Sequence, residues 1–395
     1  MTNNNPMDRK LAILSAVVLS ALGALFYNLL PMFLGVAQDY RELDNRSIGL
    51  LSSMFFAGFT LTTSTAFFWI RRINWRTVSW LALAVACLAL LMAGYTRSHA
   101  LLMLCVFIAG SAFSTVYGIA ATALSDTSNR ARWYGLKISA EAMLGAIGLF
   151  VLPATLVAGY GFMGMMAGMV LAVVLLAPAL SWLPSAGKSQ LKLDGTRTPL
   201  PVQLRLAVWV GLFAASAFMF SATMIWAFVE RLASTAGFEP VLVGKILSLT
   251  LVFAVLGSLL AVVLGDRFGS GKPFAAATLI FLIALARLSQ TTTLTDYAIG
   301  ACLLTLAIGL GITYVITIVA ELDMDGRYVV LTVPAIGVGV MSAPAIGGLL
   351  TASQGFSAIF VVGSVSIVLS LLAGLFALKK GRSPLASGKQ QNIQQ

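Results

Sequence analysis

The sequence predicts an all-α integral membrane protein of twelve spanning helices, arranged as two six-helix bundles, and three observations carry this prediction. Of 395 residues, 59% are hydrophobic and only 10% are charged, whereas about a quarter of a soluble domain's residues are charged because its surface faces water. The apolar residues form runs long enough to cross a bilayer. Basic residues gather in the short segments between those runs.

Charge and cysteine placement argue against two other classes of protein. The net charge of +11 does not indicate nucleic-acid binding, because Lys and Arg fall in short clusters between apolar runs, as in membrane proteins. Cys87, Cys105 and Cys302 lie inside apolar runs without metal-ligand or redox spacing. We therefore expect no cofactor, no metal and no nucleic-acid partner.

A spanning helix requires about 20 mostly apolar residues. The first run follows a polar start ending in Arg9 and Lys10, and it is too long for the hydrophobic region of a cleaved signal. We expect it to be retained as the first helix. The runs of sufficient length lie at 11–36, 47–70, 77–96, 100–124, 134–157, 161–183, 204–230, 241–264, 274–291, 296–320, 328–350 and 356–378.

The basic residues are divided unevenly between the two sides of the predicted membrane. If the N-terminus is cytoplasmic, 19 of the 25 Lys and Arg residues fall on the inside and the other 6 on the outside. Cytoplasmic loops carry such an excess of positive charge. We therefore expect a multi-pass protein of the cell inner (plasma) membrane with both termini in the cytoplasm.

The longest internal polar segment separates the first six predicted helices from the last six. It begins at Pro184 and contains further Gly and Pro residues, which is typical of a linker. We expect an N-terminal bundle over 1–183, a cytoplasmic linker over 184–203, a C-terminal bundle over 204–379 and a cytoplasmic tail over 380–395.

The two halves share a short pattern around their second helices. Gly49 opens the second predicted helix, and Arg71 follows it by 22 residues. Gly244 opens the eighth, and Asp266 follows it by 22, so that the two patterns are 195 residues apart.

A second pattern repeats at nearly the same distance. Tyr117 precedes Asp126 by nine residues, and Tyr314 precedes Asp323 by nine, at an offset of 197. Chance similarity between apolar helices is the alternative to an internal repeat. Two matches at nearly one offset favour parallel six-helix repeats.

The segment from Gly265 to Lys272 follows the eighth predicted helix and reads Gly-Asp-Arg-Phe-Gly-Ser-Gly-Lys. It resembles the loop signature of the major facilitator superfamily, a Gly-x-x-x-Asp-Arg-x-Gly-Arg-Lys pattern, at the second of its two places. The topology, linker and repeat extend this resemblance over essentially the whole chain. The resemblance implies a secondary transporter whose substrate cavity lies between two six-helix halves that rock against each other.

A cytoplasmic latch is expected where the signature loop lies. Asp266 ends a spanning helix, where a carboxylate can accept hydrogen bonds from the free amides of a neighbouring helix N-terminus. By the resemblance, that neighbour is the fifth helix, whose approach carries Arg130 and Arg132. These residues and Arg267 would hold the cytoplasmic side shut. An ordinary solvated turn acid is the alternative.

The first half departs from the family pattern. The repeat places Arg71, followed by Arg72, where the family often has its acid, and that loop contains no acid. The loop between the tenth and eleventh helices carries Glu321, Asp323 and Asp325 instead. We expect a latch there with its charges exchanged. Attraction of the arginines to the membrane surface is the alternative.

Helix 5 bears on the direction of transport. Drug/proton antiporters of the family carry a Gly-Pro pair near the end of this helix, whereas the segment from Gly145 to Pro153 lacks it. Its absence favours uptake over export.

Ionisable groups in spanning helices are functional candidates because burying them in the membrane is costly. Glu141 lies about two turns into helix 5, and Lys137 is four residues earlier on the same face. A carboxylate beside a cation can exchange its proton and its partner as a site opens, which proton coupling requires. A static ion pair near the interface is the alternative.

Helix 7 ends in a second candidate group. Trp226 and Glu230 are four residues apart and share a helix face, with Arg231 following. An aromatic ring beside a carboxylate suits a cavity wall that holds a polar or cationic solute. An interfacial Trp at the external water boundary is the alternative.

Uncharged polar groups lie in the helices that, by the resemblance, line the central cavity. Hydroxyl and amide groups there can bind a solute without a large desolvation cost, and hydrogen bonds between helices are the alternative use. The candidates are Tyr27 and Asn28 in helix 1, Ser114 and Tyr117 in helix 4, and Tyr314 and Thr317 in helix 10.

The leading hypothesis is a monomeric carrier of a small organic solute, driven by protons and embedded in the lipid bilayer. Export of amphiphilic drugs in exchange for protons is the alternative within the same class, and a non-transporting membrane scaffold is the alternative in another class. An enzyme is not expected, because the single histidine, His99, lies in a loop and no phosphate-binding loop occurs.

Overall fold

The computed structural model describes residues 6–128, 130–187, 202–265, 267–322 and 331–391, and this part of the chain is helical, without strands. Its long helices are α1 (Lys10–Arg41), α2 (Asn45–Trp69), α3 (Trp75–Tyr95), α4 (His99–Ser125), α5 (Arg130–Val151), α6 (Ala158–Leu176), α7 (Val202–Thr235), α8 (Pro240–Leu264), α9 (Gly271–Ser289), α10 (Leu294–Leu322), α11 (Thr332–Gln354) and α12 (Phe356–Gln391). Three short helical segments accompany them: η1 (Pro6–Asp8), η2 (Pro153–Val157) and η3 (Ala177–Trp182).

The predicted membrane fold is confirmed. Within the described residues, eleven continuous helical stretches are long and apolar enough to span a bilayer. One of them, Arg132–Trp182, is 51 residues long and contains both α5 and α6, which are separated by η2 and a kink at Gly161. The twelve predicted spans therefore correspond to α1–α12.

The connection between α5 and α6 depends on Gly161. Its φ is +55°, a conformation that glycine adopts without steric cost. A side chain there would also overlap the ring of Tyr40 near the end of α1. The sequence thus allows α6 to leave α5 at a sharp angle while remaining packed against α1.

Polar side chains cap the N-termini of α2 and α3, two helices that follow short loops. Asp44 accepts a hydrogen bond of 2.8 Å from the Ser47 amide at the start of α2, and Asn74 accepts one of 3.1 Å from the Thr77 amide at the start of α3. Such caps satisfy amides that have no partner within the helix. Hydrogen bonds from Ser47 also hold the pKa of Asp44 below its usual value.

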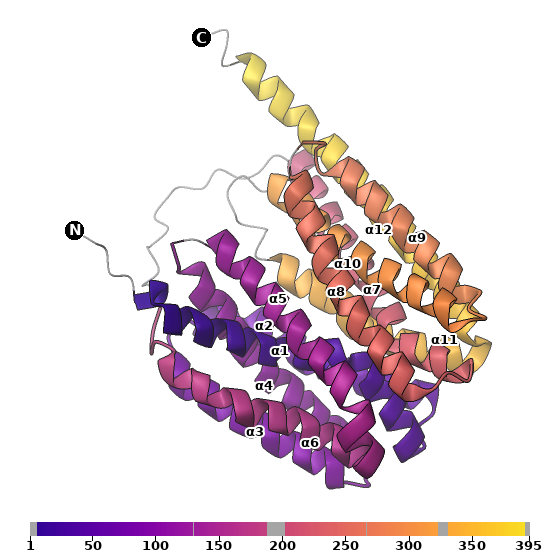
Figure 1. Ribbon diagram of the computed structural model, residues 1–395. Helices are drawn as coiled ribbons and strands as arrows, with labels where there is room; N and C mark the ends of the chain where they lie inside the picture. The colour runs from indigo at the N-terminus through magenta and orange to yellow at the C-terminus, as the bar shows by residue number, and fades with distance from the viewer. Residues whose placement is uncertain (1–5, 129, 188–201, 266, 323–330, 392–395) are drawn as a thin grey trace.

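The helices form two similar groups, α1–α6 in indigo to magenta and α7–α12 in pink to yellow (Figure 1). In the first group α4 packs against α1, α2 and α3, and in the second α10 packs against α7, α8 and α9. This matched packing is the pseudo-symmetry that the repeat predicted. Across the groups, α2 contacts α11, α5 contacts α8 and α1 contacts α7.

The helix ends define two faces of the molecule. The face of the termini is the end at which α1 begins, at Lys10, and to which α12 returns at Lys379. In Figure 1, the start of α1 and the last turns of α12 lie on this side. The far face is the end at which α1 finishes, at Arg41, and α2 begins, at Asn45.

Two glycine contacts join the groups towards the far face. Gly49 of α2 lies against the backbone oxygen of Pro344 in α11, and Gly244 of α8 lies against the backbone oxygen of Leu149 in α5. A Cβ atom at either glycine would overlap the facing backbone. Gly49 and Gly244 are 195 residues apart, as are Leu149 and Pro344, so the two contacts are equivalent.

Candidate functional site

A buried ion pair lies in α5. The Lys137 ammonium is 2.6 Å from Oε1 of Glu141, and their side chains are only 5% and 14% exposed. Four residues along a helix bring two side chains onto one face, so the sequence determines this contact locally. Burial of both groups distinguishes the pair from a solvated surface pair, because each charge then depends on the other for stabilisation.

Two neighbouring helices complete what we call the polar cluster: Ser20, Tyr117, Lys137 and Glu141. Lys137 donates a hydrogen bond of 2.9 Å to the Tyr117 hydroxyl of α4, and its ammonium lies 4.2 Å from the centre of the Tyr117 ring. The Ser20 hydroxyl of α1 donates to the same Glu141 oxygen that Lys137 contacts. Charge-assisted hydrogen bonds of this kind are stronger than those between neutral groups.

Asn28 fastens the cluster to α1. Its amide donates a hydrogen bond of 2.8 Å to the backbone oxygen of Glu141. Gly145, one turn after Glu141, makes this approach feasible, because a Cβ there would overlap the Asn28 side chain. The structure therefore brings together four predicted site residues, Asn28, Tyr117, Lys137 and Glu141.

The predicted residues of helix 7 lie at the contact between α1 and α7. The Trp226 indole donates a hydrogen bond of 3.0 Å to the backbone oxygen of Tyr27, and Trp226 is buried. Tyr27 is half-buried and packs edge-on against Phe56. Trp226 thus joins the two halves directly, a contact between helices that its cavity assignment did not include.

One turn towards the far face, α1 and α7 are joined by charge. Arg231 is 2.8 Å from Asp39 of α1 and donates a longer hydrogen bond, of 3.4 Å, to the backbone oxygen of Gly35. The carboxylate of Glu230 lies against Gly35 and is 3.8 Å from Arg231. This contact links the halves through an ion pair.

The remaining predicted cavity residues bond to backbone within their own half. Ser114 donates to the backbone oxygen of Phe59 at 2.8 Å, and Tyr314 donates to that of Gly265 at 3.0 Å. Thr317 donates at 2.8 Å to Thr313, one turn earlier in α10. Each contact matches the alternative interpretation, hydrogen bonding within or between helices, and none of these three residues bonds to the polar cluster in the described part of the structure.

Three aspartates of the predicted latch, Asp266, Asp323 and Asp325, lie outside the described residues. Of the remaining members, Arg72, Arg132 and Arg267 are exposed, and the description of Arg130 is limited to its helical backbone. Arg132 also stacks on the Trp133 ring, 4.9 Å from its centre.

Arg71 has a partner that the sequence analysis did not assign. Its guanidinium forms two hydrogen bonds, of 2.6 and 2.9 Å, with the carboxylate of Asp126 at the end of α4. Asp126 is buried, at 6% exposure. The pairing with Asp323 and Asp325 stays a prediction, and in this structure Arg71 is bound within its own half.

Three further residues were missed by sequence reasoning: Ser20, Asp39 and Asp126. Ser20 lies eight residues before Asn28 and thus on the same face of α1, a spacing that pointed to it. Asp126 was noticed only as part of the repeat. No sequence pattern pointed to Asp39 as a site residue, because its partner Arg231 lies 192 residues away in the sequence.

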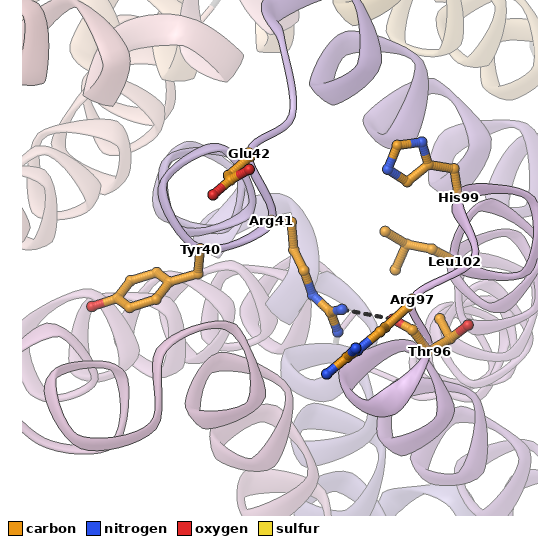
Figure 2. A pocket seen from close by; sticks show the side chains of 7 residues that line it. All are labelled: Tyr40, Arg41, Glu42, Thr96, Arg97, His99 and Leu102. Atoms are coloured by element: carbon orange, nitrogen blue, oxygen red, sulfur yellow. Dashed lines mark hydrogen bonds between the residues drawn. The ribbon is translucent and has the colours of Figure 1, made fainter.

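A small cavity on the far face lies apart from these groups (Figure 2). Its volume is about 220 Å³, and Arg41 and Arg97 are among its lining residues. Arg41 donates a hydrogen bond of 2.6 Å to the backbone oxygen of Thr96 and others to Ala93 and Gly94, at the end of α3. Because this guanidinium already caps a helix terminus, it contributes to packing in the fold.

Metal chemistry finds no support in the described residues, where no three His, Cys, Asp or Glu side chains are grouped to hold an ion. What the geometry provides is a buried Lys–Glu pair, bonded to two hydroxyl groups, inside the spanning helices of the first half. Such groups inside spanning helices mark ion or solute pathways.

Known proteins resemble this chain in sequence pattern and in fold. The sequence model described as the Major Facilitator Superfamily matches residues 12–325, most of the chain. No curated protein sequence matches significantly. A solved structure of a bacterial homologue of the human lysosomal transporter Spinster, inward-facing and unoccupied, is 13% identical, with a TM-score of 0.66 and coverage of 94% of this chain and 96% of that one.

A second solved structure, a variant of the nucleoside transporter NupG, is 14% identical, with a TM-score of 0.70 and coverage of 93% of this chain and 99% of that one. At identities this low, the two solved structures show that the fold is shared. Together with the match over residues 12–325, they show that the chain belongs to the major facilitator superfamily and is a membrane transporter, not an enzyme.

Proposed function

We propose that this protein is a proton-coupled carrier that moves a small organic solute across the cell inner membrane by alternating access. The observation that carries the proposal is the polar cluster, in which Glu141 is buried with Lys137 against α1 and α4. Uptake is favoured over export, because α5 lacks the Gly-Pro pair of the family's drug/proton antiporters. The protein would act as a monomer.

The coupling role follows from what each group can exchange. While Glu141 is ionised, Lys137 is held by two partners, Glu141 and Tyr117. Protonation of Glu141 removes the charge that stabilises the buried ammonium, so Lys137 would seek another partner or a change of conformation. A bound solute or an opened cavity provides one, and the proton and solute would thus move together.

Solute binding is assigned to the region between the halves beside this cluster. Tyr27 is half-buried there, and Asn28 follows it on α1. Trp226 provides the facing wall from α7, with Glu230 beyond it. Ser114, Tyr314 and Thr317 are assigned a packing role, because their hydroxyls bond to backbone within their own half, whereas Trp226 bonds across to the other half.

The same proposal assigns the sides of the membrane. The face of the termini would be cytoplasmic, because the basic residues are concentrated there. The halves, 1–183 and 204–379, would rock about the linker 184–203, with the tail 380–395 in the cytoplasm. The glycine contacts and the pair Arg231–Asp39 join the halves towards the far face, which supports an inward-facing state.

The latch keeps its proposed role at the cytoplasmic side. Asp266 with Arg267 would engage the start of α5, near Arg130 and Arg132, in the outward-facing state. The side chain of Arg72 is exposed. We therefore assign Arg72 as the arginine of the first half that pairs with Asp323 and Asp325. Arg71 would support that loop through Asp126.

Proton movement in proteoliposomes tests the proposal. An internal pH dye would report the response to a sugar, a nucleoside, a monocarboxylate, an aromatic acid and a cationic amphiphile. We expect a pH change with one of these solutes that Glu141→Gln abolishes. Asp296→Asn, at a carboxylate near the start of α10 that is remote from the cluster, is the matched control and should leave the signal intact.

Two results would contradict the proposal. A solute-driven pH change that survives in Glu141→Gln would move the coupling site elsewhere. Solute transport without any pH change, in protein shown to be folded, would favour sodium coupling or facilitated diffusion.

A further inference from the structure

A second buried carboxylate, Glu230, lies between the halves on the far side of Trp226. Only 9% of the residue is exposed, and its Oε2 atom has no hydrogen-bond partner among the described residues. An ionised carboxylate without full hydrogen bonding is costly in a buried site, whereas the neutral acid costs far less.

The surrounding charges do not compensate for an ionised Glu230. Arg231 is nearest, at 3.8 Å, but its guanidinium is engaged by Asp39 at 2.8 Å. Glu239, before α8, adds a third carboxylate to the same cavity. The hydroxyl of Tyr297 in α10 donates to the backbone oxygen of Val229, at 3.2 Å, and not to Glu230. Asp39, Glu230 and Glu239 therefore line one cavity, while the nearest guanidinium, that of Arg231, is already bound by Asp39.

Glu230 also lines a cavity that belongs to both halves. Its volume is about 250 Å³, and its walls come from α1 and η2 of the first half and from α7 and α8 of the second. Tyr40 and Glu239 on its rim are exposed. A proton from the far-face solution can therefore reach the carboxylate without crossing the contact between the halves.

The repeat explains how this site is built. Gly35 of α1 and Glu230 of α7 are 195 residues apart, the offset of the two equivalent glycine contacts, and they face each other. A Cβ at Gly35 would overlap the Glu230 carboxylate. One half thus provides the space and the other half provides the acid.

We propose that Glu230 is a second proton-binding site, which takes its proton from the far face and in the protonated form allows α1 and α7 to close there. Deprotonation places an uncompensated charge in the closed contact, and opening returns that charge to water. Glu230 therefore binds its proton more tightly in the closed state than in the open state. Low pH favours closure, and high pH opposes it. This assignment is separate from proton coupling at Glu141 and needs no solute.

Distance measurements by pulsed electron paramagnetic resonance test the proposal. Spin labels at the exposed residues His99 and Thr292, one in each half, would report far-face opening in purified protein whose three cysteines are replaced by alanine. In the parent we expect the ratio of open to closed molecules to rise with pH, by at most about tenfold per pH unit between the pKa values of Glu230 in the closed and open states, as for a single coupled proton.

The variants identify the group that titrates. Glu230→Gln should remain closed at every pH, whereas Glu239→Gln, and Asp44→Asn at an exposed helix cap outside both sites, should keep the parent's pH dependence. If the amide prevents folding, Glu230→Met provides a neutral side chain of similar length without a polar end. It should also stay closed.

Three outcomes would overturn the proposal. The parent could show no change of distance with pH, or both Glu230 variants could titrate like the parent. Loss of the pH dependence in Asp39→Asn, with its retention in Glu230→Gln, would assign the proton to the Asp39–Arg231 pair. Because no solute is added, these outcomes are distinct from failure of the transport assay at Glu141.

Discussion

The two halves share one architecture but differ in where they carry charge. In the first half, α5 holds Lys137 and Glu141, buried against α1 and α4. The equivalent positions of α11, 195 residues later, hold Thr332 and Ile336. The repeat thus keeps the packing of the two halves alike, while only α5 carries an ion pair at these two positions. Under the proposed function, this difference would make the first half the one that couples solute movement to protons.

The largest effect is expected when the ion pair of the first half is broken on one side. Lys137→Met should lower the stability of the protein by about 3–5 kcal/mol, because it leaves the Glu141 carboxylate buried without its cation. Thermal unfolding of purified protein would show a lowered midpoint. The double variant Lys137→Met with Glu141→Gln should recover most of this loss while remaining unable to couple.

The control for this prediction comes from the second half. Thr332→Val, at the position equivalent to Lys137, removes a hydroxyl but no charge and should change the midpoint far less. Equal destabilisation by Thr332→Val and Lys137→Met would show that the charge difference between the halves has no energetic consequence.

A smaller effect is expected at the pair Arg71–Asp126, which fastens the loop after α2 to the end of α4. Arg71→Glu should cost about 1.5–3 kcal/mol, the range for hydrogen bonds to charged groups, because the new carboxylate faces the buried Asp126. Adding Asp126→Arg should restore the thermal midpoint.

The same variant tests the predicted latch between the halves. If Arg71 acts mainly through the loop between α10 and α11, reversal of Asp323 should rescue transport in Arg71→Glu and reversal of Asp126 should not. Rescue by Asp126→Arg alone would confine the role of Arg71 to the first half.

The sequence predicted the architecture and one centre of the site, for reasons that differ between residues. The twelve apolar runs and the 195-residue repeat depend on composition and sequence period, so they can be recognised without knowing how the helices pack. The contact between Lys137 and Glu141 depends only on helical spacing. The partner of Arg231 depends on how α1 crosses α7, because Asp39 is 192 residues away, and sequence alone does not specify that crossing.

The hydroxyl-bearing residues show a second limit. Ser114 and Tyr117 are only three residues apart in α4, yet Ser114 bonds to the backbone of α2 and Tyr117 bonds to Lys137. A polar residue in a spanning helix satisfies the nearest partner that packing provides. Position within a cavity-lining helix therefore did not separate site residues from packing residues.

The next prediction concerns a feature that both halves share. Gly244→Val should cost about 1–3 kcal/mol in the closed far face, by overpacking, because its side chain would overlap the backbone of Leu149. Gly49→Val should have a similar effect against Pro344. Spin labels at His99 and Thr292 would show a larger open population in both variants.

Gly159 provides a matched control, since it has open space around the position of a Cβ atom. Gly159→Val should leave the distance distribution unchanged. A strong effect of Gly244→Val with none from Gly49→Val would show that the two equivalent contacts do not share the closure equally.

The smallest effect is expected from Ser20→Ala, which gives α1 the residue that α7 carries at the equivalent position, Ala215. Ser20 donates one hydrogen bond to Glu141, so its loss should cost about 1.5 kcal/mol, the low end of the range for hydrogen bonds to charged groups. Lys137 still stabilises the ionised carboxylate, and coupling should therefore persist. The expected result is a solute-driven pH signal of normal stoichiometry, with a slightly lowered thermal midpoint. Abolished coupling would instead make Ser20 as necessary to the polar cluster as Lys137.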